Sequence, residues 1–396
     1  MRRGLRLAAV NLAIFFALLI ATNIVSGVLL KLSENVTVRH QVHAILGVGG
    51  TPLTSKAELP PYAGNEAHAR AVWKESERAH NYEFAPFVEW RKRPFRGKYV
   101  TVSEAGDRVY DPGTDPPGGA PVVRFFGGSA VWGTGVDDSH TLPALYAREH
   151  RDYRVYNHGE GAYVSRQNLE RLINLMTRGQ RTDVAVFYEG FNDVLVLCEV
   201  HTTLNGQDEE APMRRILSDP QPLSDIFFGH TLALVRKLRG TSDEEFRCDS
   251  DPGHANRVAA TVTNVWRLAR RLQEVGCGRL IVVLQPVAPL GRPRVDYLGD
   301  ENDADPLEDY DRYVRQLRTV YPKWQAAARR AENRSWLFDL TNAFDGDRPL
   351  FVDLVHVADA GNAMMAARMA PLVERALEDV KRCRAGSRKE STRGRG

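Results

Sequence analysis

The amino-acid sequence predicts a three-layer α/β domain with a central parallel sheet, preceded by one transmembrane helix. Apolar runs and amphipathic stretches alternate from residue 121 to residue 382, which is the pattern of βαβ units. Residues 122–135 combine a short apolar run, without regular polar alternation, and a glycine-rich turn, as expected of a strand that is covered on both faces. Residues 7–30 carry no charge and are numerous enough to cross a bilayer as a helix.

Residues 1–32 are predicted to form a basic cytoplasmic tip and a membrane anchor. Three arginines precede the apolar stretch, and fewer basic residues follow it closely, so the positive-inside tendency places the amino terminus in the cytoplasm. A cleaved signal peptide is the alternative, but the small-residue cleavage candidates are weak. We therefore expect a single-pass membrane protein whose catalytic domain is extracytoplasmic, in a periplasm or at the cell surface.

The chain between the anchor and the alternating region is polar and irregular. Residues 33–120 contain two Pro-Pro pairs and several glycines, although residues 67–80 have helical composition. We expect a juxtamembrane stalk that leads into the first layer of the domain.

The alternating region, residues 121–382, is predicted to be one domain with an insertion. Helices are expected at 141–150, 165–178, 256–275, 310–331 and 360–382, and strands at 154–156, 183–188, 279–284 and 336–340. Residues 195–254 interrupt this alternation of strands and helices. Their amphipathic piece, 223–238, is expected to pack as a surface helix on the core rather than to form a lid or a membrane-proximal flap. The basic segment 383–396 is expected to be a disordered tail.

Ser129 is the candidate nucleophile. It lies in the turn that follows the strand beginning at Val122, and ligands bind at the carboxyl ends of strands in open parallel sheets. A serine hydroxyl is a weak nucleophile until a base takes its proton. The alternative is a solvated serine in a glycine-rich turn.

Asp353 and His356 are the candidate partners of this serine. Their spacing, just before the closing helix, lets the carboxylate orient the imidazole, which would then accept the serine proton. An Asp-x-x-His pair alone is a weak signal, because most such pairs are surface residues or helix caps.

Two further turns follow strands at the same predicted sheet edge. Asn192 comes after the strand at 183–188, and its amide could donate a hydrogen bond to the oxyanion of a tetrahedral intermediate. Residues 157–163 form a glycine-rich turn after the strand at 154–156, and its backbone N–H groups could supply another donor. Each stretch alone could also be a plain turn.

Together these four stretches resemble, in order, the motif blocks of the SGNH or GDSL hydrolases. The blocks are Gly127-Gly128-Ser129, residues 157–167, Gly190-Phe191-Asn192-Asp193, and Asp353-Leu354-Val355-His356. The resemblance implies a flavodoxin-like fold and a serine esterase, with Ser129 as nucleophile, His356 as base and Asp353 as its orienting acid. It also implies an oxyanion hole made by the Ser129 N–H, a second-block N–H and the Asn192 side chain.

The sequence departs from this family at two positions. Gly128 replaces the aspartate that usually precedes the serine. The second-block oxyanion glycine falls on Ala162, whose N–H can serve if its φ is negative, and Gly161 is the fallback donor.

Other chemistries lack their motifs. There is no Gly-x-Ser-x-Gly around Ser129, no His-Glu-x-x-His to support a metal site, and no Gly-Lys-Ser/Thr after the glycines for phosphate binding. The net charge of +3 comes from nearly balanced totals, so no nucleic-acid-binding field is implied. We expect neither a metal nor a cofactor, and no feature of the sequence defines an oligomeric state.

The cysteines test the predicted location of the domain. Cys198 and Cys248 bracket the insertion, and an oxidising compartment would permit a disulfide between them. Cys277, beside the strand at 279–284, is expected to be a buried thiol, and Cys383 lies in the basic tail.

The resulting hypothesis is a membrane-anchored esterase that hydrolyses acyl esters, including acetyl esters, of an envelope glycan or lipid. Trp132, Tyr163 and Phe191 lie beside the motif residues and are candidates for the pocket wall. Two alternatives stay open: an O-acyltransferase that acts on an envelope glycan, and a catalytically silent envelope-binding protein on the same fold.

Overall fold

The computed structural model describes residues 2–34, 53–113, 115–200, 202–207, 228–232, 234–235, 246–298 and 310–393. Its contacts divide the chain into two compact units. One comprises Met1–Pro52 and Glu209–Glu245, and the other comprises Leu53–Asp208 and Phe246–Gly396.

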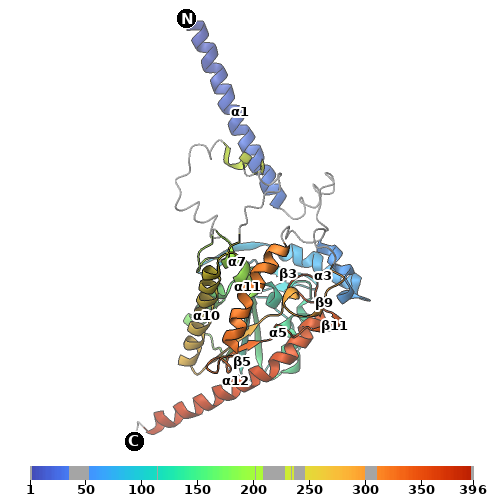
Figure 1. Cartoon of the computed structure of the whole chain (residues 1–396), viewed down its shortest axis with the longest axis vertical. Coiled ribbons are helices and arrows are strands. Elements are labelled where there is room, and N and C mark those ends of the chain that lie inside the picture. The colour runs from blue at the N-terminus through green and yellow to red at the C-terminus, as the bar shows by residue number, and fades with distance from the viewer. Residues whose placement is uncertain are drawn as a thin grey trace. The chain divides into compact units, whose positions relative to one another are not determined.

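A five-stranded parallel sheet forms the centre of the second unit (Figure 1). Its strands lie in the order β10 (Leu337–Asp339), β8 (Arg279–Leu284), β7 (Val184–Glu189), β5 (Val122–Gly127) and β6 (Arg154–Gly159). All four pairings are parallel. Numbered along the chain, the order is 2-1-3-4-5, the flavodoxin-like arrangement. The predicted fold class is therefore confirmed.

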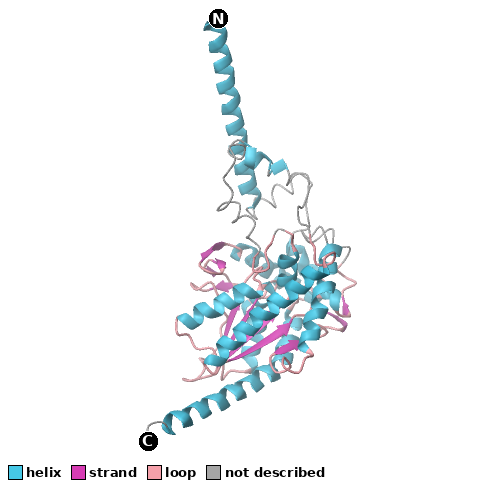
Figure 2. Ribbon diagram, turned by 60° about the vertical axis from the view of Figure 1, so that its left-hand side comes forward, coloured by secondary structure: helices cyan, strands magenta, loops and turns pink. Residues whose placement is uncertain are grey.

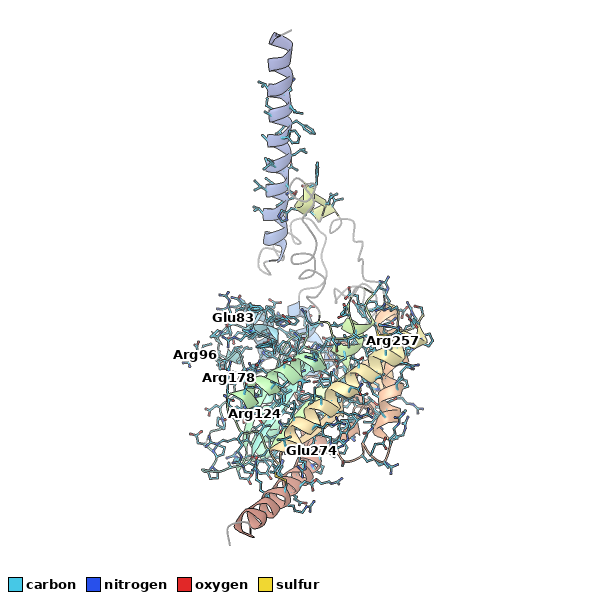
Figure 3. All side chains as sticks on the ribbon, turned by 90° about the vertical axis from the view of Figure 1, so that its left-hand side faces the viewer. Glu83, Arg96, Arg124, Arg178, Arg257 and Glu274 are labelled. Atoms are coloured by element: carbon cyan, nitrogen blue, oxygen red, sulfur yellow. A yellow bond between two sulfur atoms is a disulfide. The ribbon has the colours of Figure 1, made fainter. Side chains whose placement is uncertain are left out.

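Helices cover both faces of this sheet (Figure 2). On one face α5 (Leu142–Glu149) packs against α12 (Asp359–Arg393). On the other face α10 (Pro252–Val275) packs against α6 (Ser165–Thr177) and α11 (Tyr310–Ala328). Figure 3 shows α10 side-on, with Arg257 near its start and Glu274 near its end. The arrangement has the three layers that the alternating sequence predicts.

Local signals explain where several helices begin. The Thr141 side chain accepts a hydrogen bond from the Ala144 N–H and caps α5, while Asp251 accepts from the His254 N–H and caps α10.

The shorter elements are η1 (Leu53–Glu58), η2 (Pro60–Tyr62), α3 (Glu66–Ala79), β1 (Tyr82–Ala85), β2 (Glu89–Lys92), β3 (Phe95–Arg96), β4 (Thr101–Val102), α4 (Ser129–Trp132), η3 (Asp138–His140), α7 (Phe191–Cys198), η4 (Ala288–Leu290), β9 (Pro293–Arg294) and β11 (Gly346–Pro349).

Residues 53–113 pack on the domain, within the range 33–120 where the sequence predicts a stalk that leads into the first layer of the domain. Buried apolar side chains of η1, η2 and α3 cluster with Val352 and Ala358, on either side of the Asp353–His356 loop. The hydrophobic contact holds this segment on the domain, because it removes Tyr62 and Trp73 from water. Residues 35–52 of the expected stalk lie outside the described residues.

The first unit contains α1 (Arg2–Glu34). Its stretch Val10–Leu29 is long and apolar enough to cross a membrane. The Asn23 side chain accepts hydrogen bonds from the N–H groups of His230 and Thr231, at 2.9 and 3.2 Å. The described part of the amphipathic piece 223–238 thus contacts α1, whereas the sequence predicts contact with the core; residues 223–227, 233 and 236–238 lie outside the described residues.

Two disulfides are present in the described part of the chain. Cys198 and Cys248 form the predicted bond across the insertion. The second bond joins Cys277 to Cys383, so the expectation of a buried free thiol at Cys277 is wrong. The cause is the course of α12, which packs along β8 and so brings Cys383 to the turn before that strand. The helix then continues to Arg393, through most of the expected disordered tail. Arg384 adds an ion pair with the buried Asp183, and residues 394–396 lie outside the description.

Candidate active site

The parallel register of three strands brings their following turns together. Gly127 at the end of β5 pairs with Gly159 of β6 and Tyr188 of β7. Ser129 follows β5 at the first position of the short helix α4. A side chain at Gly159 would collide with the backbone of α4, so glycine at this position allows α4 to pack closely against β6.

His356 joins Ser129 to Asp353. The His356 Nε2 lies 2.7 Å from the Ser129 Oγ, and its Nδ1 lies 2.8 Å from the Asp353 Oδ2. A carboxylate can only accept, so Nδ1 carries the proton and Nε2 is left to accept the serine proton. The three residues that the sequence nominated therefore have the geometry of a nucleophile, its base and the acid that orients the base.

The loop that carries this pair is fixed by its own hydrogen bonds. The Asp353 Oδ1 accepts from the N–H groups of Val355 and His356, at 3.0 and 2.8 Å. The Val352 N–H donates to the His356 carbonyl at 2.9 Å. His356 is consequently held in place both by hydrogen bonds to its backbone and by the hydrogen bond to its ring.

Lys56 is a site residue that the sequence analysis missed. Its ammonium donates to the Asp353 Oδ2 at 2.9 Å, and its side chain is only 7% exposed. It is 297 positions away from Asp353 in the sequence and lies in η1, within the segment expected to be a stalk. No motif links the two residues, so only the packing of η1 on the Asp353 loop reveals the pair.

The charge of Asp353 is strongly favoured in this setting. Burial opposes ionisation, but the positive charges available from His356 and Lys56 and the local hydrogen bonds hold the pKa of the Asp353 carboxyl well below its ordinary value. Asp353 therefore stays an anion throughout the neutral range and can stabilise the imidazolium that forms when His356 accepts a proton.

Two backbone N–H groups beside Ser129 are available as oxyanion donors. In the described residues, neither the Ser129 N–H nor the Ala162 N–H donates to another protein group. The fallback donor is engaged, because the Gly161 N–H donates to the Glu160 Oε1 at 2.8 Å. The geometry thus favours Ala162 over Gly161.

Asn192 lies at the start of α7 and brings its amide to the same place. Its Nδ2 donates to the Tyr163 carbonyl at 2.9 Å, which fixes the amide and leaves the second Nδ2 proton for a ligand. Together with the Ser129 and Ala162 N–H groups, this arrangement can stabilise negative charge that develops on a carbonyl oxygen.

The backbone at Ala162 differs from the expectation. Its φ is 60°, in the left-handed region that favours glycine, whereas the sequence analysis required a negative φ. Ala162 therefore keeps the backbone conformation suited to the glycine of the resembled family, at a strain of roughly 1 kcal/mol.

The glycine at position 128 has a steric reason. Its φ of −82° is open to any residue, but a β-carbon there would clash with the Asn192 Nδ2. A side chain at position 128 would therefore have to displace the Asn192 amide from its place beside the turn.

A cavity of about 350 Å³ opens on Ser129 and His356. Phe191 and Ala162 line it, as does the N-terminal segment through Lys56, Ser76, His80 and Tyr82. The predicted wall residues Trp132 and Tyr163 do not line this cavity. Trp132 is 1% exposed between the Lys92 and Arg108 cations, and the Tyr163 hydroxyl donates to the Trp90 carbonyl.

Two buried carboxyl groups, those of Glu189 and Asp193, lie on either side of Asn192 in the sequence, at the end of β7 and the start of α7. The Ser165 Oγ donates to the Asp193 Oδ2 at 2.7 Å and contacts the Glu189 Oε2 at 3.2 Å, and the Trp266 Nε1 donates to this hydroxyl at 2.8 Å. Burial raises the pKa of Asp193 to about 6 and raises that of Glu189 well above its ordinary value. The network ties the start of α6 to the start of α7.

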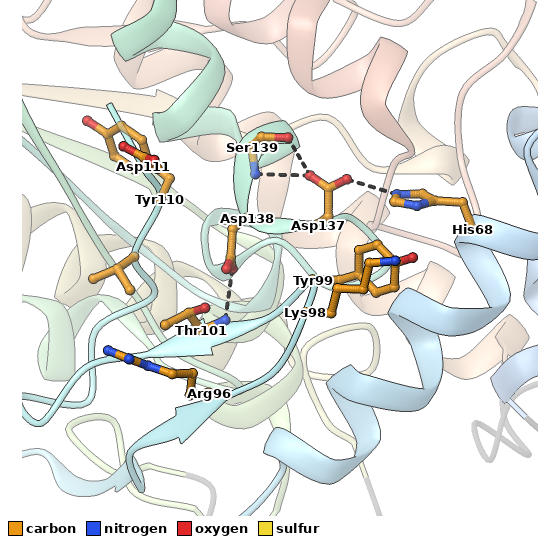
Figure 4. Close-up of a pocket in the computed structure, with 11 residues that line it drawn as sticks. His68, Arg96, Lys98, Tyr99, Thr101, Tyr110, Asp111, Asp137, Asp138 and Ser139 are labelled. Atoms are coloured by element: carbon orange, nitrogen blue, oxygen red, sulfur yellow. Dashed lines mark hydrogen bonds and ion pairs between the residues drawn. The ribbon is translucent and has the colours of Figure 1, made fainter. Parts of the chain in front are cut away.

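A second cavity, of about 620 Å³, is lined by none of the predicted catalytic residues (Figure 4). Asp137 accepts from the Ser139 N–H and hydroxyl and contacts His68 at 2.8 Å. Asp138 pairs with Arg108. The Ser139 Oγ also lies 3.0 Å from the His140 Nδ1, which contacts the same Asp137 carboxylate. Because the carboxylate accepts the Ser139 proton, this hydroxyl differs from that of Ser129, which faces the acceptor nitrogen of His356.

Comparisons with known proteins find solved structures at low sequence identity and low TM-score. No family model and no curated protein matches the sequence. The solved structures it resembles include a carbohydrate acetylesterase family member from Sinorhizobium meliloti, at 15% identity and a TM-score of 0.33 over 65% of this chain and 99% of that chain. A lipolytic G-D-S-L family protein from Veillonella parvula has 14% identity and a TM-score of 0.35, and the match covers 64% of this chain and 97% of that chain. A catalytic mutant of an acetylxylan esterase from Geobacillus stearothermophilus has 15% identity and a TM-score of 0.33, and the match covers 67% of this chain and 96% of that chain. These values do not establish a family.

Proposed function

We propose that this protein is a serine esterase of the SGNH type that hydrolyses carboxylic esters through an acyl-enzyme on Ser129. The observation that carries the proposal is the hydrogen-bonded series Ser129 Oγ, His356, Asp353, with separations of 2.7 and 2.8 Å. The free N–H groups of Ser129 and Ala162 and the Asn192 amide support it, because an ester carbonyl attacked by Ser129 needs such donors.

The mechanism follows from the positions of the protons. The Ser129 Oγ attacks the ester carbonyl carbon while the His356 Nε2 takes the serine proton, and the carbonyl oxygen becomes the oxyanion. When the intermediate collapses, His356 gives this proton to the leaving alcohol and an acyl-serine remains. Water then repeats the sequence, with His356 as base, and releases the acid and free Ser129.

We also propose that α1 anchors the protein and that the hydrolase domain is extracytoplasmic. The uncharged stretch Val10–Leu29 and the arginines before it support a single-pass topology with a cytoplasmic amino terminus. The two disulfides favour an oxidising compartment for the domain.

The experiment is a comparison of two serine variants of the full-length protein in detergent. Ser129→Ala should lower kcat on p-nitrophenyl acetate at least about a thousandfold, because the nucleophile is removed. Ser139→Ala, which removes a hydroxyl bonded to Asp137, should retain activity. Equal activity of Ser129→Ala and the wild type would rule out the nucleophile assignment.

A further inference from the structure

One wall of the catalytic cavity is polar and comes from the N-terminal segment. Ser76 and His80, one helical turn apart at the end of α3, line the cavity, and Tyr82 at the start of β1 lies next to them. These residues belong to the segment 53–113 that packs on the domain. The polar wall is therefore an addition to the four motif blocks and shares no residue with them.

Ser76 presents a buried hydroxyl without a protein partner. The residue is 1% exposed, and within the described part of the chain its Oγ makes no hydrogen bond. An unsatisfied buried polar group costs roughly 1–3 kcal/mol. Ser76 lines the cavity, and a rotation of its side chain about χ1 would present the hydroxyl to a bound ligand, whose hydrogen-bonding group would then recover this energy.

His80 presents an acceptor. Its Nδ1 lies 2.7 Å from the Ser76 carbonyl oxygen, which only accepts, so Nδ1 carries the proton. His80 keeps an exposed face, but the protein atoms packed around the rest of the ring and the nearby Lys92 cation lower the pKa of His80 to about 4, so the ring is neutral at physiological pH. The Nε2 lone pair is then an acceptor on a residue that lines the cavity.

Tyr82 presents a donor. Its hydroxyl oxygen accepts from the Lys92 ammonium at 3.0 Å, so the hydroxyl proton points away from Lys92. The side chain is 37% exposed. Among the described residues, no acceptor receives this proton. The wall thus offers an acceptor, a donor and a hydroxyl that can act as either.

We propose that this wall binds the alcohol part of the ester, and that this part is polyhydroxylated, as in a carbohydrate. The inference rests on the proposed esterase activity. Neighbouring hydroxyl groups of a sugar both donate and accept, which matches Ser76, His80 and Tyr82, whereas an aliphatic alcohol would leave all three unpaired. The cavity is also lined by the apolar side chains of Ala162, Phe191, Leu354 and Val355, which can accommodate the acyl group.

The test compares two acetate esters that differ only in the character of the alcohol. Full-length protein in detergent is assayed on a mono-acetylated methyl glucoside and on cyclohexyl acetate, with p-nitrophenyl acetate as the activated reference. The wild type should favour the sugar ester in kcat/KM. The His80→Phe and Ser76→Ala variants should each lower the ratio of the two kcat/KM values roughly tenfold, because one hydrogen bond to the sugar is lost.

Arg70→Ala is the matched control. Arg70 lies on the exposed side of α3 and pairs with Glu58 at 2.8 Å, so its removal should leave the ratio unchanged. Melting temperatures equal to that of the wild type verify the fold of each variant. Two results would overturn the polyhydroxyl assignment: a wild-type preference for cyclohexyl acetate, or a ratio that changes in neither the Ser76 nor the His80 variant. If p-nitrophenyl acetate is still hydrolysed, the proposed esterase activity stands. Failure to hydrolyse any of the three esters overturns both proposals.

Discussion

The Lys56 ammonium lies 2.9 Å from the carboxylate of Asp353, on the same Oδ2 that contacts His356. A cation in this position competes for the negative charge that stabilises the imidazolium. Lys56→Met removes one of the positive groups that hold the pKa of the Asp353 carboxyl down, and it leaves the carboxylate charge undivided for the imidazolium. The acidic limb of the kcat/KM–pH profile should therefore move upward by about one pH unit.

The control for this prediction is Arg70→Met, which removes a cation from an exposed ion pair on the neighbouring helix. It should leave the profile unchanged. If Lys56→Met reduced the rate equally at all pH values without moving the limb, Lys56 would be a packing residue with no electrostatic role.

Gly128→Ala should lower kcat by about a hundredfold or more, with little change in KM. The new methyl group would displace the Asn192 amide, an oxyanion donor whose loss costs roughly 3 kcal/mol in other hydrolases. Gly118→Ala is the matched control, because a β-carbon at Gly118 meets no neighbouring atom among the described residues. Unchanged kcat in Gly128→Ala would show that Asn192 does not act in the transition state.

Ala162→Gly should increase the free energy of unfolding by about 1 kcal/mol, because it relieves a left-handed conformation with φ of 60°. The same substitution at Ala144, inside α5, should decrease it by a similar amount. Chemical denaturation of the two variants distinguishes these signs. A loss of stability at position 162 as large as that at position 144 would contradict the strain.

The buried Asp193 predicts a pH dependence of stability. Its pKa, raised to about 6, exceeds that of the unfolded carboxyl, so the folded state binds the proton more tightly. Its contribution to stability is fully present below about pH 4 and is lost as the pH rises through 6, to an extent of roughly 3 kcal/mol.

Asp193→Asn mimics the protonated carboxyl and removes this loss. The melting temperature of Asp193→Asn minus that of the wild type should increase by several degrees from pH 4.5 to pH 8. The comparison cancels the opposite contribution of Asp353, whose lowered pKa stabilises the fold above the acidic range. A difference that does not change with pH would mean that Asp193 is ionised in the folded protein at both pH values.

The sequence predicts the sheet and the groups at its edge because both depend on local patterns. The buried runs of β5, β7 and β8 are continuous in the sequence, and Ser129, Asn192 and the Asp353–His356 pair each follow or precede a regular element directly. The parallel register then brings them together without further information.

The remaining features depend on contacts between distant segments. Lys56 meets Asp353 only because Tyr62 and Trp73 bury their rings against the residues beside Asp353. Cys277 meets Cys383 only because α12 packs along β8, a contact between segments that are 106 positions apart at the two cysteines. The positive φ of Ala162 is likewise set by the turn as a whole, and alanine gives no local signal for it.

The central claim is that Ser129 carries the acyl group during turnover. The most direct measurement is peptide mass spectrometry of full-length protein that is acid-quenched while it hydrolyses p-nitrophenyl acetate, an activated ester whose acylation step is fast. The account predicts one acetyl group on the peptide that contains Ser129, which disappears as the substrate is consumed and is absent from Ser129→Ala. Steady hydrolysis with no acetyl group on Ser129, or with the acetyl group on another residue, would contradict it.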